Sequence, residues 1–223
     1  MKKTKQSEGK CLICGNVFSK RAMSGHLEKC IQKIETPMGK GRLWEGEIFH
    51  IRVEGRDSPQ YWLNIEASAK ATLKDIDKFL REIWLECCGH LSAFTIGEVS
   101  YSSHPDRYSN ERGMNIALWK VLEMGLKFHH EYDFGTTTDL TLKVVSGRSG
   151  KIKGKVCLLA RNEAPSINCS LCGKPASDVC TECIWEDNGA WLCEDCAEKH
   201  ECGEDMLLPV VNSPRVGMCG YTG

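Results

Sequence analysis

The strongest constraint on this chain is a dense run of cysteines near its C-terminal end. Residues 169–202 contain three Cys-x-x-Cys pairs, and a histidine and another cysteine follow the third pair. The eight side chains are Cys169, Cys172, Cys180, Cys183, Cys193, Cys196, His200 and Cys202. Sets of four thiolate and imidazole groups are typical of structural zinc, so eight such groups suit two tetrahedral ions. We therefore predict that residues 166–223 form a binuclear zinc module.

The order of these ligands favours one pairing scheme. It resembles a cross-brace module of the B-box type, in which the first and third pairs share one ion. The second pair then shares the other ion with the two ligands that follow; a sequential scheme, which joins the first two pairs, is the alternative. The B-box pattern has a histidine where this chain has Cys202, and Cys219 is a second-choice replacement for that ligand. Protein side chains fill every position, which leaves no place for a catalytic water, so we expect structural zinc.

A smaller ligand set lies at the other end of the chain, within residues 8–32. Its members are Cys11, Cys14, His26 and Cys30. The set resembles the Cys-Cys-His-Cys variant of the ββα zinc finger, with its last two ligands on one face of a helix. The helix positions that read bases in such fingers hold Ser19, Ala22 and Gly25, and none of these can make a bidentate contact to a base edge. We expect a zinc finger that does not read DNA sequence.

The cysteine content and the distribution of charge indicate the cellular compartment and the kinds of partner. The fourteen cysteines suit metal better than disulfides, because most have metal-ligand spacing and the chain shows no export signal or long apolar span. We therefore expect a reducing cytoplasm, no membrane segment and about three zinc ions per chain. Residues 1–30 carry seven Lys/Arg and two Asp/Glu, a charge of +5, whereas residues 163–223 carry three and eleven, a charge of −8. The basic head can make nonspecific contacts with nucleic acid, and the acidic tail suits a protein partner.

Between the two ligand sets, residues 47–162 have the pattern of a globular domain, which a linker at residues 33–46 joins to the finger. Alternating apolar residues predict strands near residues 48–53, 61–67, 91–96, 128–134, 140–144 and 156–159. Thr72, with Asp75 three residues later, predicts the start of a helix whose apolar stripe runs to Trp84. The order of these elements predicts an α+β fold, with a central, largely antiparallel sheet flanked by two small zinc-stabilised modules.

Two motifs in the central segment carry a resemblance to a known family. They are GHLSAF at residues 89–94 and FHHEYDFG at residues 128–135. With these motifs in this order, residues 47–162 resemble the Ri-plasmid ORF-three-like family, also called the insertion-element passenger TnpR family. The resemblance implies a small α+β domain with no established biochemical activity. The chain departs from the family at residues 136–139, where Thr-Thr-Thr-Asp stands in place of the usual Asp, Trp and His.

The central domain also offers one weak set of residues for catalysis. His129, Glu131 and Asp133 alternate onto one face of a predicted strand, where they can bind a divalent metal for hydrolysis or act as acid and base. A solvated sheet face explains the same pattern. His90 is a second candidate because it lies in a family motif. Cys88 and the cysteine before it suit one tetrahedral ion poorly, and a nucleophilic Cys88–His90 pair lacks an orienting third group.

The sequence thus favours a prokaryotic, non-catalytic zinc protein of an uncharacterised family that acts as a binding or adaptor module. Two alternatives stay open. One is a nucleic-acid-associated protein linked to mobile elements, which would use the basic residues 1–30; the other is a metal-dependent hydrolase built on His129, Glu131 and Asp133. In the acidic tail, Trp185, Trp191 and residues 206–211 either form a contact surface, or pack the core of the module or dock it onto the central domain.

Overall fold

A ten-stranded sheet dominates the fold and confirms the α+β class. The computed structural model describes residues 7–32, 43–186 and 189–223. The strands of the sheet are β1 (Glu8–Cys11), β2 (Val17–Ser19), β3 (Leu43–Gly55), β4 (Trp62–Ser68), β5 (Ser92–Ile96), β6 (Val99–Ser102), β7 (Arg112–Gly113), β8 (Lys127–Tyr132), β9 (Thr138–Lys153) and β10 (Val156–Asn162). They lie in the order β2-β1-β10-β4-β3-β9-β8-β5-β6-β7, and neighbours are antiparallel except β6 and β7.

The predicted hairpin forms at the centre of the sheet, but its second strand, β4, is buried on both faces. The β3–β4 hairpin sets Ile48 opposite Ser68 and Glu54 opposite Trp62. The longest ladder joins β3 to β9 and is much longer than the apolar alternation alone indicated. Residues 114–126, an apolar segment whose sequence suits either a helix or a strand, contain a short helical turn at Leu118–Lys120.

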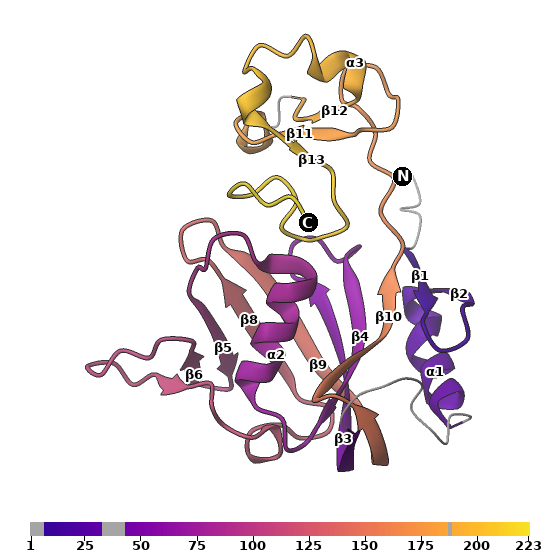
Figure 1. Ribbon diagram of the computed structural model, residues 1–223, viewed down its shortest axis with the longest axis vertical. Helices are drawn as coiled ribbons and strands as arrows, with labels where there is room; N and C mark the ends of the chain where they lie inside the picture. Colours follow the sequence, from indigo (N-terminus) through magenta and orange to yellow (C-terminus); the bar gives the residue numbers. More distant parts are fainter. Residues whose placement is uncertain (1–6, 33–42, 187–188) are drawn as a thin grey trace.

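One amphipathic helix, α2 (Leu73–Leu80), packs against a face of the sheet (Figure 1). Thr72 and Asp75 form the predicted reciprocal cap, in which each side chain accepts a hydrogen bond from the backbone N–H of the other residue. The helix continues as a wider π-helical turn at Arg81–Leu85, which buries Trp84 and ends before Cys87. The segment after it contains Cys87, Cys88 and His90.

The N-terminal finger is built into the sheet rather than attached through a linker alone. Strand β1 pairs with β10, and Gly9 lies opposite Asn162. Helix α1 (Lys20–Ile31) covers a second apolar core whose centre includes Trp62 of β4. Of the predicted linker at residues 33–46, residues 33–42 lie outside the described part of the chain, and the remainder belongs to β3.

The C-terminal module lies beyond one end of the large sheet, and the last segment of the chain returns between them (Figure 1). The module holds a three-stranded sheet in the order β12-β11-β13, made of β11 (Asp178–Cys180), β12 (Trp191–Leu192) and β13 (Leu207–Pro209), with the short helix α3 (Glu194–Ala197). Val179, Ala190 and Val216 belong to the same apolar core as the large sheet. The module and the central domain therefore share one core.

Candidate metal centres

The first candidate centre lies where β1 ends and α1 runs past it. Cys11 is the last residue of β1, Cys14 lies on the turn that ends at Gly15, and His26 and Cys30 come from α1. The Cys14 Sγ and His26 Nε2 atoms are 3.4 Å apart. Gly15 has a φ of +76°, a conformation that glycine adopts without strain. The structure thus brings together the four residues that the spacing predicted.

The C-terminal module forms two further groups in the cross-brace order. The first and third pairs meet as Cys169, Cys172, Cys193 and Cys196, with the Cys172 Sγ atom 3.5 Å from Cys193 Sγ and 3.7 Å from Cys196 Sγ. The sequential scheme, in which the first two pairs meet, is not the grouping that the structure shows.

The second pair of the module meets the two ligands that follow the third pair. The group is Cys180, Cys183, His200 and Cys202. Cys183 Sγ lies 3.4 Å from His200 Nε2 and 3.7 Å from Cys202 Sγ. Cys202 therefore takes the fourth position, and Cys219, the second choice from sequence, lies in a different group.

The spacing of the ligand atoms fits a tetrahedral ion. Metal–sulfur bonds of about 2.3 Å and a metal–nitrogen bond of about 2.0 Å separate two sulfurs by roughly 3.8 Å, and a sulfur and a nitrogen by roughly 3.5 Å. The distances in these three groups, 3.5–3.7 Å and 3.4 Å, are close to those values. A disulfide requires about 2.05 Å, and all fourteen cysteines are free.

Local electrostatics favour the same conclusion. Burial raises the pKa of the Cys169 thiol, but hydrogen bonds from the backbone of Cys193, Cys172 and Leu171 together outweigh that effect and lower the pKa to about 6. In the second group, burial and the neighbouring Cys180 thiolate raise the pKa of Cys183 to about 12. In these groups one cysteine loses its proton easily, and the negative charge then makes it harder for the next cysteine to lose its own. A divalent cation at the centre of the group offsets the repulsion between the thiolates.

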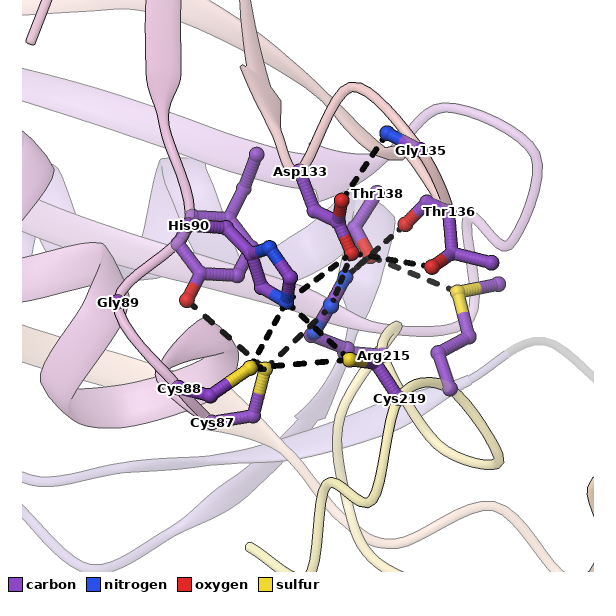
Figure 2. A network of polar contacts seen from close by, with 12 residues as sticks. Cys87, Cys88, Gly89, His90, Asp133, Gly135, Thr136, Thr138, Arg215 and Cys219 are labelled. Carbon is purple, nitrogen blue, oxygen red and sulfur yellow. Dashed lines mark hydrogen bonds and ion pairs between the residues drawn. The ribbon is translucent and has the colours of Figure 1, made fainter. Parts of the chain in front are cut away.

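A fourth group was missed by sequence reasoning. Cys87, Cys88, His90 and Cys219 also place their ligand atoms within 4.8 Å of one another. Two features hid it: its first two cysteines are adjacent, which breaks the usual knuckle spacing, and its last cysteine is 129 residues from His90. Only the three-dimensional fold brings them together (Figure 2). Cys157 is the one cysteine outside the four groups.

The residues proposed for hydrolysis do not form a site. The alternation of β8 ends at Tyr132, and Asp133 adopts a φ of +64° that turns it away from the strand. Its carboxylate accepts a hydrogen bond from Arg215 at 2.7 Å and lies 3.4 Å from His90 Nε2. Across the described residues, neither His129 nor Glu131 belongs to any metal-sized group. The expected common face of His129, Glu131 and Asp133 is therefore wrong, because the backbone turns after Tyr132.

Comparisons with known proteins give little further guidance. No family model matches this chain, and no curated protein matches it. One solved structure that does match is a protein of unknown function from Methanosarcina mazei Go1, at 15% identity and a TM-score of 0.43. The match covers 48% of this chain and 64% of that one, so this chain spans less than two thirds of that protein. The resemblance to the Ri-plasmid ORF-three-like family stays a prediction.

The helices of the described residues were compared with the length and apolar character that a membrane span requires. None of the helices formed by residues 7–32, 43–186 and 189–223 is both long enough and apolar enough to cross a membrane.

Proposed function

We propose that this chain is a cytoplasmic, zinc-binding and non-catalytic protein that acts as a binding or adaptor module. The observation that carries the proposal is the composition of the three groups anticipated from sequence. Each supplies four Cys or His ligands, which is the full set that a tetrahedral ion takes. Soft thiolates combined with imidazole favour zinc over magnesium, calcium or manganese. A site filled by protein ligands stabilises a fold and leaves no position for a reacting water.

The acidic C-terminal module supplies a surface for a protein partner. Trp185 is 61% exposed and Leu171 is 65% exposed, whereas Trp191 packs against the core that the module shares with the central domain. Leu208, Val210 and Val211 pack there too, while Met206 is exposed. Exposed aromatic side chains are enriched where proteins bind one another. The segment that the sequence left undecided is therefore divided between core and surface.

The finger gives less support to a role on nucleic acid. Lys20, one of its basic residues, pairs with Glu54 at 2.5 Å and donates to the Pro59 carbonyl at 2.8 Å. Arg21 and Lys29 are exposed and can still reach phosphates. Nonspecific contact through residues 1–30 stays as an alternative, and the mobile-element link rests on the family resemblance of residues 47–162.

Metal analysis of the purified full-length chain tests the first part of the proposal. Zinc should be present at about three ions per chain or more, and a strong chelator should remove it with loss of structure in residues 166–209. A zinc content near zero in protein purified without chelators would overturn the proposal.

Site-specific photo-crosslinking in the native host tests the adaptor role. A crosslinker in place of Trp185 should capture a partner that the same crosslinker in place of Trp119 does not. Trp119 is 57% exposed on the central domain, so it is a matched control. The purified partner should then bind the Trp185→Glu variant more weakly than the Trp119→Glu variant. Equal binding of the partner to both variants would remove the C-terminal module as its docking surface.

A further inference from the structure

Hydrogen bonding alone does not explain why the side chains of the fourth group converge on a single ring nitrogen. A single ring nitrogen, His90 Nε2, lies 3.0 Å from Cys88 Sγ and 3.1 Å from Cys219 Sγ. The same atom lies 3.4 Å from the Asp133 carboxylate. A ring nitrogen carries one hydrogen or one lone pair, so it can serve only one of these three neighbours as a hydrogen-bond partner. A cation among the ligands satisfies both sulfurs and the nitrogen together.

The sulfur atoms have the spacing of a coordination sphere. Cys88 Sγ is 3.7 Å from Cys87 Sγ and 3.8 Å from Cys219 Sγ, against roughly 3.8 Å for two sulfurs on one tetrahedral ion. The sulfur–nitrogen distances are shorter than the ideal of roughly 3.5 Å, and small outward movements of Cys88 and Cys219, which are both exposed, correct them. Cys219 also has a φ of +46°, an uncommon conformation for a residue other than glycine.

A buried guanidinium supports the group from the inside. Arg215 is fully buried, and its Nη2 donates to Asp133 Oδ2 at 2.7 Å and to Cys87 Sγ at 3.4 Å. Its Nη1 donates to the Thr136 carbonyl and to the Thr138 hydroxyl, both at 3.1 Å. Figure 2 shows Arg215, Asp133 and the four group members directed toward one another. The positive charge of Arg215 stabilises a thiolate at Cys87 and so compensates for the crowding of three sulfurs.

The group joins two parts of the chain that are far apart in sequence. Cys87, Cys88 and His90 follow the helix of the central domain, whereas Cys219 lies on the last segment of the chain, after the zinc module. The other three groups each draw their ligands from a single short stretch of at most 28 residues. A metal ion in the fourth group would therefore act between parts of the fold, not within one small module.

We propose that Cys87, Cys88, His90 and Cys219 bind a fourth zinc ion, which fastens the C-terminal segment, residues 210–223, to the central domain. The three thiolates and one imidazole fill the four positions of the ion, so its role is structural. The segment that it holds runs directly on from β13, so the ion also limits the movement of the C-terminal module. This inference rests on none of the ligands of the other three groups, and it can fail while the proposed function stands.

Metal counting with matched variants tests the fourth site. The full-length chain should contain four zinc ions, and Cys219→Ser and Cys88→Ser should each contain three, because each loses only this ion. Both residues are exposed, so neither change disrupts the core. Cys157→Ser, at the one cysteine outside the groups, is the control and should keep four. Cobalt substitution should show the same loss in the intensity of the thiolate charge-transfer band.

Hydrogen exchange tests the fastening role in the same proteins. Amides of residues 210–223 should exchange faster in Cys219→Ser than in Cys157→Ser, while residues 166–209 keep their protection. Three outcomes would overturn the inference: three ions in the unmodified chain with no change in Cys219→Ser, a Cys88–Cys219 disulfide in the purified protein, or unchanged exchange of residues 210–223 after the fourth ion is lost. Absence of all zinc would overturn the proposed function together with this inference, whereas three ions would overturn this inference alone.

Discussion

Replacing Trp62 should show that the finger and the sheet form one folding unit. The Trp62 side chain is fully buried in the second core, together with Cys11, Met23 and Leu27. Its indole N–H donates to the Ser7 hydroxyl at 2.9 Å. The ring lies so close to β1 that a Cβ added at Gly9 would come within 2.4 Å of it. The finger therefore rests directly on a residue of β4.

The magnitude follows from this burial. Truncating a fully buried tryptophan to alanine costs about 3–5 kcal/mol, because the transfer free energy and the cavity both count. With a urea m-value of about 3 kcal/mol/M, the midpoint of unfolding should fall by roughly 1–1.7 M. Trp62→Phe keeps most of the apolar ring and loses the hydrogen bond to Ser7, so its cost should be smaller. Trp119→Ala, on the exposed surface, should change the free energy of unfolding by less than about 0.5 kcal/mol.

Urea unfolding at constant excess zinc measures the free energy, and hydrogen exchange locates the effect. In Trp62→Ala, amides of β1, α1 and β10 should lose protection together, because β1 pairs with β10 in the same sheet. A loss below about 1 kcal/mol would refute the reasoning about burial. Unchanged protection in β10, combined with loss in α1, would show that the finger unfolds independently.

Three further predictions follow from buried charges and metal. Arg215→Met should cost about 3–5 kcal/mol in urea unfolding, because it leaves the Asp133 carboxylate buried without its partner; adding Asp133→Asn should recover part of that loss. Burial raises the pKa of Asp77, but its interactions with His130, Ser92 and Arg81 together outweigh that effect and lower the pKa to about 2. This carboxylate therefore stabilises the fold above about pH 4 and loses that contribution as the pH falls toward 2, so the unfolding free energies of the native chain and Asp77→Asn should converge in acid. Chelation should abolish hydrogen-exchange protection of residues 166–209 while the β3–β9 ladder keeps its protection.

The Cys/His groups could be predicted from the sequence where their members lie close together in the chain with the spacing that a metal ion requires. A Cys-x-x-Cys pair folds as a knuckle within a few residues, so its spacing is visible without knowledge of the fold. The helix cap formed by Thr72 and Asp75 could be predicted for the same reason, because a cap is a local hydrogen-bond pattern. Cys202 lies in the group of Cys183, and Cys219 lies in a different group. The spacing of the cysteines favours this arrangement but does not determine it, because it depends on how distant segments of the chain fold together.

The missed features come from contacts between distant segments. Alternation at residues 61–67 predicts a strand with one buried face, yet every residue of β4 is buried, and Trp62 packs against the finger on the second face. The fourth metal group depends on a tail that folds back onto the end of a helix. Asp133 departed from the strand pattern because its side chain pairs with Arg215, which is 82 residues away. None of these contacts leaves a periodic signal in the sequence.

The pairing of β1 with β10 has a consequence for the order in which the protein is made. The first described strand pairs locally with β2, but its partner on the other side, β10, comes only at residues 160–162. The finger therefore emerges from the ribosome long before β10 and the Trp62 surface are complete. Because the four candidate ligands lie within residues 11–30, we expect the finger to bind its metal ion before β10 has been made. We expect closure of the large sheet to be a late, slow step with a high loop-closure cost, and an early metal ion to keep β1 and α1 folded together until then.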